Sequence, residues 1–232
     1  MRDKFWFKNI FKDSEFTIDD SALSKLSAFT ELLIGKNQEV NLISSKSEGN
    51  IWEEHILHSL SFLLKIKINE KAKILDLGAG GGLPGIPLKI IYPDLNITLL
   101  DSTQKKIIAD KEMIMELGLK GIIAVSGRAE ELKSDINLKE KYDYVISRAV
   151  GQLDKLFEWG LPFLKKEKIR NEGMISAGTI LVLKGGDISE EIKKVKRSKK
   201  LDKVEVIDIV FPGSEDLFNP DKKLVIMYPK FY

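Results

Sequence analysis

Five short β-rich runs follow one another through the middle of the chain, with amphipathic stretches between them. The runs are ILDL at residues 74–77, ITLLD at 97–101, IIAVS at 122–126, YDYVIS at 142–147 and TILVLK at 179–184. Strands that alternate with helical stretches are typical of βαβ units, in which crossover helices connect parallel strands. The sequence therefore predicts an α/β fold with a doubly wound, mostly parallel sheet and helices on both faces.

The two ends of the chain depart from this alternation. Before residue 70, apolar residues at helical spacing predict one helix that ends near residues 35–37, and a second that starts with a capping box at Asn50 and Glu53. The last β-rich runs, at residues 204–211 and 222–229, have too little sequence between them for a crossover helix and predict an antiparallel hairpin. We expect a helical N-terminal extension over residues 1–70, packed on an α/β domain over residues 71–232.

Composition limits the chemistry available to the chain. The 232 residues are 43% hydrophobic and 31% charged, which is ordinary for a globular domain. The absence of cysteine excludes thiolate catalysis and thiolate zinc sites, and it suits a reducing cytosol. No window approaches the ~20 apolar residues of a membrane span, and charges interrupt the apolar runs near residue 1. We expect a cytoplasmic monomer that has no contact with a membrane.

The segment that follows the first run is rich in glycine. Its sequence, GAGGGLPGIPL at residues 78–88, contains a literal G-x-G-x-x-G that starts at Gly80, the pattern of dinucleotide binding. In a nucleotide-binding turn, however, the first glycine directly follows the last buried strand residue. Because the strand should end at Leu77, the relevant positions are Gly78, Gly80 and then Leu83. The third glycine of the dinucleotide pattern is missing in this register.

Asp76 distinguishes two classes of cofactor for this loop. A dinucleotide would place a pyrophosphate beside the turn, and a nearby carboxylate would repel it. S-adenosylmethionine instead carries a positive sulfonium and a positive α-ammonium, which a carboxylate attracts. The sequence therefore favours S-adenosylmethionine as the cofactor, with Asp76 among the residues that bind it. The alternative interpretation is that the Asp76 side chain only caps the next turn.

Further positions are expected to contact the nucleoside part of the cofactor. Asp101 ends the second run about twenty residues after the glycines, where an acid can accept hydrogen bonds from both ribose hydroxyls. After the third run, Ala129 and Glu130 belong to a segment that can contact the adenine. Glu130 can equally be an ordinary first-turn residue of a helix, and its position alone favours neither role.

The end of the fourth run bears on the reaction itself. Ligands of an open parallel sheet bind at the carboxyl ends of its strands, so Ser147 and Arg148 should face the reacting centre. The chain lacks the side chains that methylation of an exocyclic amine or a pyrimidine carbon requires, whereas purine N7 has a free lone pair and needs mainly positioning. The catalytic residues stay unassigned. Arg148 is the candidate, as a donor to guanine O6 or to a cofactor carboxylate, unless it only pairs with an acid such as Asp143.

The chain has two histidines, His55 and His58, which lie three residues apart in the second predicted helix. This spacing is compatible with metal ligation, but no third ligand motif accompanies the pair. We expect a surface or half-buried pair of histidines and no metal site.

Seven short segments of the chain occur together in one known family. They are NLIS at residues 41–44, HILHSL at 55–60, DLGAGGGLPGIPL at 76–88, LLDS at 99–102, RAEE at 128–131, YDYVISRA at 142–149 and LKG at 183–185. On these segments the chain resembles the bacterial small-subunit ribosomal RNA guanine-N7 methyltransferases, the RsmG or GidB family, over almost its whole length. A glycine loop followed by LPGIP is much more specific than a methyltransferase loop alone.

The resemblance implies transfer of a methyl group from S-adenosylmethionine to N7 of a guanosine in 16S ribosomal RNA, free or in its ribonucleoprotein particle. It implies a Rossmann-like class I methyltransferase domain, with cofactor-binding positions at Gly78, Leu83, Ala129, Glu130 and Arg148. The net charge of +2 and the basic run at residues 193–203 permit an RNA partner without requiring one. The alternative is an S-adenosylmethionine-dependent methyltransferase that acts on a small metabolite under a closing lid.

The chain departs from this family at three places. His58 stands where the family usually has Asp, and the continuation after the fourth run is Val150-Gly151-Gln152 in place of a Phe or an Ala-rich segment. The segment from Lys165 to Gly178 is longer than is typical of the family. Position 58 lies outside the cofactor set, and the second departure concerns the substrate side and leaves methyl transfer intact.

Overall fold

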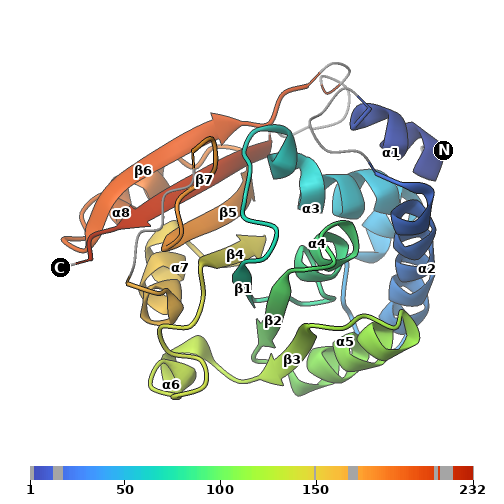
Figure 1. Ribbon diagram of the computed structural model, residues 1–232, viewed down its shortest axis with the longest axis horizontal. Helices are drawn as coiled ribbons and strands as arrows, with labels where there is room; N and C mark the ends of the chain where they lie inside the picture. The colour runs from blue at the N-terminus through green and yellow to red at the C-terminus, as the bar shows by residue number, and fades with distance from the viewer. Residues whose placement is uncertain are drawn as a thin grey trace.

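A mixed β-sheet forms the centre of the computed structural model, which describes residues 3–12, 18–148, 150–166, 172–211, 214 and 222–231. Within these residues, seven strands lie in the order β3-β2-β1-β4-β5-β7-β6 (Figure 1). Their bounds are β1 Lys73–Leu77, β2 Asn96–Asp101, β3 Ile122–Ser126, β4 Tyr144–Arg148, β5 Thr179–Gly185, β6 Leu201–Asp208 and β7 Lys222–Pro229. The strands β1 to β5 pair in parallel, whereas β7 is antiparallel to both β5 and β6. The predicted doubly wound sheet and its antiparallel C-terminal hairpin are both confirmed.

Helices cover both faces of the sheet (Figure 1). The helices after β1 are α4 Gly85–Ile91, α5 Gln104–Glu116, α6 Ala129–Leu132, α7 Leu153–Gly160 and α8 Ser189–Val195, with a 3₁₀ turn η4 at Leu161–Phe163. Successive strand residues point to opposite faces, so Ile74 packs in one hydrophobic cluster and Leu75 and Leu77 pack in the other. Asp76 therefore faces the same side as Ile74, which is the side that α4 covers.

The chain before β1 is helical and shares its core with the sheet domain. Its elements are α1 Lys4–Ile10, α2 Asp20–Asn37, η1 Ser45–Asn50, η2 Trp52–Leu57, α3 His58–Leu60 and η3 Ser61–Leu64. The end of α2 at Asn37 confirms the predicted break. Phe29 of α2 and Ile56 of η2 belong to the same buried cluster as Ile86 and Leu88 of α4. A division at residue 70 into an extension and a catalytic domain stays a prediction.

The second predicted N-terminal helix is wrong in its detail. Instead of one α-helix from Asn50, the chain forms a 3₁₀ turn, a π-helical turn and then short α and 3₁₀ turns. The cap position of η2 is Ile51 instead of Asn50, and no side-chain hydrogen bond caps it. A π-helical turn fits an extra residue into the helix and changes which side chains face the core. Consequently His55 and His58 both point inward.

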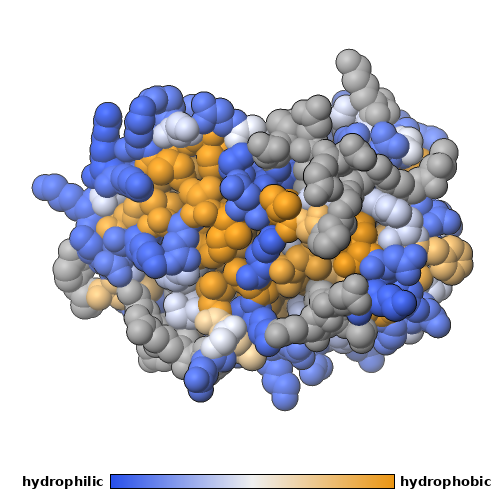
Figure 2. Space-filling model, turned by 90° about the horizontal axis from the view of Figure 1, so that it is seen from above, coloured by the Kyte–Doolittle hydropathy of each residue, from blue (hydrophilic) through white to orange (hydrophobic). Residues whose placement is uncertain are grey.

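The C-terminal hairpin forms one edge of the sheet, with β6 as its last strand. Seen from above, hydrophobic residues extend across the middle of this face, with hydrophilic residues around and between them (Figure 2). On β6 itself, Val206 is 43% exposed, while Lys203 and Asp208 carry charges on the same strand. Such charges on an edge strand oppose pairing with a strand of another molecule.

Candidate cofactor site at the carboxyl ends of the strands

The glycine loop turns the chain sharply between β1 and α4. Gly78 and Gly80 have positive φ angles of 77° and 61°, which residues with a Cβ rarely adopt. The amides of Gly78 and Ala79 donate hydrogen bonds to the Leu100 carbonyl oxygen at 2.7 and 3.1 Å, so the loop is tied to β2. Because β1 ends at Leu77, the register in which Gly78 is the first glycine of the loop is confirmed.

Asp101 fixes the loop from the neighbouring strand. Its Oδ2 accepts a hydrogen bond from the Gly80 amide at 3.0 Å, and its Oδ1 accepts one from the Thr103 amide at 2.8 Å. Each carboxylate oxygen has a second lone pair, so Asp101 can hold the loop and still accept hydrogen bonds from a ligand. The predicted acid at the end of the second strand is therefore also a structural part of the first loop.

A cavity of about 310 Å³ opens at the carboxyl ends of β1, β2 and β3. The residues that line it are Leu77, Gly78, Leu100, Asp101, Ser102, Gly127, Arg128, Ala129, Glu130, Val150 and Trp159. Four of the predicted cofactor residues meet here: Gly78, Asp101, Ala129 and Glu130. Apolar walls with a few converging polar groups are typical of small-molecule sites. The predicted residues Asp76, Gly80, Leu83 and Arg148 do not contribute to this lining.

Asp76 lies beneath the loop and is fully buried. Its Oδ2 accepts a hydrogen bond at 2.7 Å from the amide of Gly85, the first residue of α4. This is the contact that the capping interpretation predicts. Burial raises the pKa of Asp76 to about 7, and the Gly85 hydrogen bond opposes that rise. A carboxyl group that is partly protonated near neutral pH repels a pyrophosphate less than an ionised one, so Asp76 distinguishes the two classes of cofactor less sharply than its position in the sequence predicts.

A second acid lies on the same side of the sheet. Asp110 of α5 is also fully buried, and neither of its side-chain oxygens has a hydrogen-bond partner within the described part of the chain. Burial raises the pKa of Asp110 to about 8, and the nearby Asp76 adds to the rise. Asp110 was not predictable as a buried acid, because position 110 lies inside an amphipathic helix among other charged residues.

Arg148 is held by the N-terminal extension at the end of β4. Its Nη1 donates to the Glu54 carbonyl oxygen at 3.1 Å, and its Nη2 lies 3.0 Å from His55 Nδ1. The Nε–H group is buried and has no acceptor among the described residues. Asp143 instead accepts from Lys165 Nζ and from the Lys73 amide, each at 2.7 Å. Asp143 is therefore not the partner of Arg148, and the acid that acts on Arg148 electrostatically is Asp76.

The histidines are the residues that sequence reasoning placed wrongly. His55 is 8% exposed and His58 is 6% exposed, so neither lies at the surface or half-buried as expected. His55 joins Arg148 to Ser47, whose Oγ lies 2.7 Å from His55 Nε2. Among the described residues, no group of three or more His, Cys, Asp or Glu side chains is arranged to hold a metal ion.

The segment after β4 closes one side of the cavity and is fastened from β5 and α8. Val150 lines the cavity, and a Cβ added to Gly78 would lie only 2.5 Å from its Cγ2. Lys184 Nζ donates to the Gly151 carbonyl oxygen at 2.6 Å and lies 2.9 Å from Glu191 Oε2. That same oxygen accepts from the Leu153 amide at 2.9 Å, which fixes the start of α7.

The longer segment at residues 165–178 is described only at its two ends, because residues 167–171 lie outside the described part of the chain. At one end Lys165 pairs with the Asp143 carboxylate, and at the other the Gly178 amide donates to the Asp143 carbonyl oxygen at 2.7 Å. Both described ends are thus tied to the start of β4.

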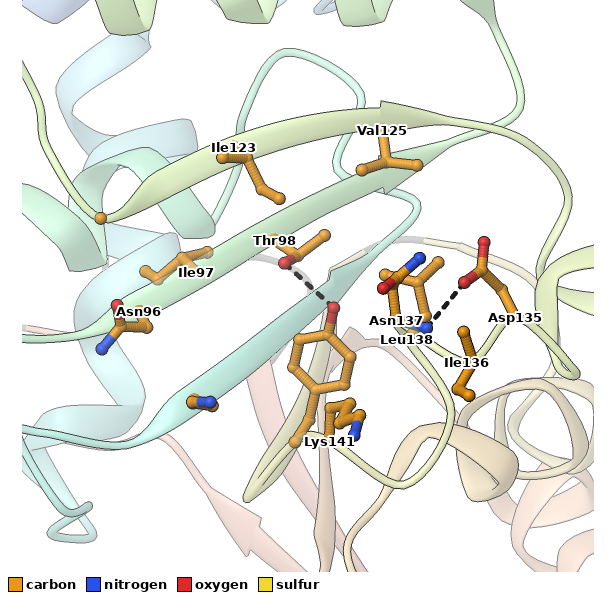
Figure 3. A pocket seen from close by; sticks show the side chains of 13 residues that line it. Asn96, Ile97, Thr98, Ile123, Val125, Asp135, Ile136, Asn137, Leu138 and Lys141 are labelled. Carbon is orange, nitrogen blue, oxygen red and sulfur yellow. Dashed lines mark hydrogen bonds between the residues drawn. The ribbon is translucent and has the colours of Figure 1, made fainter.

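A larger cavity of about 870 Å³ lies near the amino ends of β1 and β2, away from the predicted cofactor residues. Ile97, Ile123 and Val125 from the sheet line it together with Ile136 and Leu138 from the segment after α6 (Figure 3). Tyr142 Oη donates to Thr98 Oγ1 at 3.0 Å on its floor. Ligands of parallel sheets bind at the opposite, carboxyl ends of the strands, so size alone does not make this cavity the active site.

The strand order, the glycine loop after β1 and the acid that ends β2 together define a Rossmann-like class I methyltransferase. The sequence model of the GidB family, described as rRNA small subunit methyltransferase G, matches residues 22–218. The chain belongs to this family.

Known relatives agree with this assignment. The chain is 38% identical over 218 residues to Ribosomal RNA small subunit methyltransferase G of Pelodictyon phaeoclathratiforme, covering 92% of this chain and 88% of the relative. It is 40% identical over 178 residues to the protein of the same name from Thermoanaerobacter sp. strain X514, covering 77% and 70%. A putative O-methyltransferase from Klebsiella pneumoniae has a similar fold, with a TM-score of 0.57, 11% identity and 96% of each chain covered. Within the described ranges, no helix is long and apolar enough to cross a membrane.

Proposed function

We propose that the chain transfers a methyl group from S-adenosyl-L-methionine to N7 of a guanosine in 16S ribosomal RNA. The observation that carries this proposal is the cavity at the carboxyl ends of β1, β2 and β3, where Gly78, Asp101 and Glu130 meet. Its place in the fold and its acidic groups suit a nucleoside that carries positive charge. Membership of the methyltransferase G family supports the ribosomal RNA as the methyl acceptor.

The residues of the site fit S-adenosylmethionine group by group. Gly78 lines the cavity with its backbone, and Val150 of the cavity wall fills the space that a Cβ would take. Asp101 keeps free lone pairs for the ribose hydroxyls, and Ala129 with Glu130 lies where the adenine would bind. The buried Nε–H of Arg148 lacks an acceptor among the described residues, and the cofactor carboxylate would supply one.

The remaining predicted cofactor residues act from outside the cavity lining. The Gly80 amide donates a hydrogen bond to Asp101 and so keeps that acid in place. Leu83 is buried under the loop, and its amide donates to the Ala79 carbonyl oxygen at 3.0 Å. Asp76 caps α4 and supports the loop from below. We assign these residues the role of shaping the cofactor site rather than of touching the reacting atoms.

The cofactor supplies an activated methyl group on its sulfonium, and guanine N7 supplies the lone pair that attacks it. No proton has to be removed before the attack, so the chain needs no general base and contributes mainly by aligning the two reactants. This agrees with the described lining of the cavity, where acids and backbone amides hold the loops and no hydrogen-bonded pair of a general acid and a general base is found.

The basic residues of the chain suit an RNA substrate, although the longest basic run begins β6 beside Pro229, at the amino end of β5 and away from the cavity. Arg128 lines the cavity, and the basic run at residues 193–203 covers the end of α8 and the start of β6. Phosphate contacts made by such residues release counterions, so RNA affinity should fall steeply as salt rises. We place the enzyme in the cytoplasm as a monomer that binds the small-subunit RNA or its particle. Methylation of a small metabolite is the alternative, and it requires no such salt dependence.

The proposal is tested by incubation of the protein with labelled S-adenosylmethionine and small-subunit RNA, or particles from a strain that lacks the protein. The RNA is then digested to nucleosides, and RNA binding is measured across a salt series. We expect label in N7-methylguanosine and a steep salt dependence of binding. A complete lack of labelled guanosine with every form of the RNA would contradict the proposal, and a flat salt dependence would favour the metabolite alternative.

A further inference from the structure

A chain of hydrogen bonds joins the end of β4 to the N-terminal extension. Arg148 Nη2 contacts His55 Nδ1 at 3.0 Å, His55 Nε2 contacts Ser47 Oγ at 2.7 Å, and Ser47 Oγ contacts the Ser44 carbonyl oxygen at 2.7 Å. His55 and Ser47 are both buried, at 8% and 4% exposure. This series of hydrogen bonds therefore runs through the interior, where a hydrogen bond cannot readily be replaced by one to water.

The chemistry of the end groups fixes the direction of every bond in this chain. A guanidinium group only donates, so His55 Nδ1 must be the acceptor and carries no proton. A carbonyl oxygen only accepts, so the Ser47 hydroxyl donates to Ser44 and accepts the Nε2–H of His55. His55 is thus a neutral imidazole with its proton on Nε2. Burial and the nearby Arg148 lower the pKa of His55 to about 3, which keeps the ring neutral in the ordinary pH range.

The charged groups that act on the pair come from three elements. Lys222 of β7 and Arg148 both act on His58 of α3, and Asp76 of β1 acts on Arg148. Burial keeps the pKa of His58 well below its usual value, and burial and Arg148 lower the pKa of Lys222. A protonated His55 would turn its Nδ1 from an acceptor into a donor and would add charge beside two cations.

The π-helical turn η2 brings two acceptors to the same guanidinium. The Glu54 carbonyl oxygen takes a hydrogen bond from Nη1, and His55 Nδ1 takes one from Nη2. Two adjacent residues of one turn therefore accept hydrogen bonds from both Nη groups of Arg148. The Nε–H of the same guanidinium is buried and has no acceptor in the described part of the chain. π-helical turns recur at functional sites in proteins.

We propose that His55 is a positioning residue for methyl transfer, which holds the Arg148 guanidinium through an uncharged acceptor so that the free Nε–H meets the carboxylate of S-adenosylmethionine. This inference rests on the proposed function, because it requires Arg148 to bind the cofactor. It makes the N-terminal extension part of the cofactor site without any contact of its own with the cofactor. If His55 only filled the core and bound Ser47, its substitution would leave the position of Arg148 unchanged.

Two substitutions of similar size separate the two ring nitrogens. In His55→Asn the amide oxygen lies near the position of Nδ1 and can accept from Arg148. In His55→Gln the amide group reaches the position of Nε2 and keeps the contact with Ser47, but it leaves Arg148 without its acceptor. A role in positioning predicts that Asn preserves function better than Gln, whereas a role limited to the Ser47 contact predicts the reverse order.

The measurement is the dissociation constant of S-adenosylmethionine by calorimetry, together with kcat and KM for methyl transfer to small-subunit RNA. We expect His55→Gln to weaken cofactor binding roughly tenfold or more, the effect of losing one hydrogen bond to a charged group. We expect His55→Asn to lie within about threefold of the wild type, and KM for the RNA to change little in either variant. Tyr142→Phe is the control, because it removes a buried hydrogen bond at the opposite end of the sheet.

Three outcomes would overturn the inference: equal cofactor affinity in the Asn and Gln variants, a weaker Asn variant, or a Tyr142→Phe control that loses as much affinity as His55→Gln. If the variants do not fold, nitrogen NMR of the wild-type protein decides the question. We expect an unprotonated Nδ1 and a protonated Nε2 from pH 5.5 to pH 8, and a proton on Nδ1 would contradict the proposal. A wild type that does not bind S-adenosylmethionine refutes the proposed function itself, whereas normal binding with unaffected variants refutes only the role of His55.

Discussion

The Asp101 carboxylate at the end of β2 accepts a hydrogen bond from the Gly80 amide across the mouth of the proposed cofactor site, at 3.0 Å. One acid thus serves two neighbouring strand ends, because its other oxygen is bound by the Thr103 amide. The position of the glycine loop and the position of the ribose-binding acid are therefore coupled. A change at Asp101 should affect both the ligand contacts and the loop.

We expect Asp101→Ala to weaken the binding of S-adenosylmethionine by about 10- to 100-fold, because hydrogen bonds to a charged group are lost together with the loop contact. Asp101→Asn keeps one oxygen acceptor and should lose less affinity than the alanine variant. Calorimetric titration measures both. Asp135→Asn changes an acid in the larger cavity and should bind as the wild type does. Unchanged affinity in Asp101→Ala would show that the ribose is bound elsewhere.

Gly78 should tolerate no side chain, for two separable reasons. Its φ of 77° disfavours any residue with a Cβ, and that Cβ would lie 2.5 Å from Val150 Cγ2. Gly118 has a similar φ of 61° but open space around it, so Gly118→Ala carries the backbone strain alone, about 1–2 kcal/mol of unfolding free energy. We expect Gly78→Ala to cost more than Gly118→Ala in urea unfolding, and Val150→Ala in the same chain to recover part of the difference. Equal costs at both glycines would argue against close packing of the loop on Val150.

Asp110 should make the protein less stable as the pH rises. Its folded-state pKa of about 8 lies above the ordinary value of 3.8, so stability from the neutral acid is full below 3.8 and is lost as the pH rises toward 8. Asp110→Asn has no such titration. The difference in unfolding free energy between the variant and the wild type should therefore grow in favour of the variant from pH 5 to pH 8, by an amount on the order of a few kcal/mol. A difference that is constant with pH would show that Asp110 is charged in the folded protein.

The contact of Lys184 with Glu191 should support the substrate side of the cavity. Both side chains are largely buried, at 12% and 23% exposure, and together they hold Gly151 and the start of α7. We expect a double-mutant cycle of Lys184→Met and Glu191→Gln to give a coupling energy of about 1–2 kcal/mol in unfolding. We also expect Lys184→Met to raise KM for the RNA more than it weakens cofactor binding. Independent, additive effects of the two substitutions would show that the contact of Lys184 with Glu191 does not hold Gly151 and the start of α7 in place.

The sheet and the glycine loop were predictable because their signals are local. The apolar run that ends at Leu77 fixes the strand, and the next residue must turn, so the register of Gly78 and Gly80 followed directly. The short link before β7 likewise allowed only an antiparallel pairing. Each of these features depends on residues that are close together in the sequence.

The region around Arg148 was not predictable in the same way. The direction of Asp76 follows from strand alternation, but its choice of Gly85 as a partner depends on how α4 returns to the sheet. The inward position of His55 depends on a π-helical turn, which has no clear pattern in the sequence and which an ideal α-helical spacing misplaces. Partners 93 and 94 residues apart in the chain, such as His55 and Glu54 with Arg148, become visible only in the fold.

The account is tested most directly by a crystal structure of the protein with S-adenosylhomocysteine or S-adenosylmethionine bound. We expect one molecule in the cavity at the ends of β1, β2 and β3, with its ribose hydroxyls on Asp101, its adenine beside Ala129 and Glu130, and its carboxylate within hydrogen-bond distance of Arg148. A molecule bound instead in the cavity between β3 and Tyr142, or one that leaves Asp101 without a contact, would contradict the account.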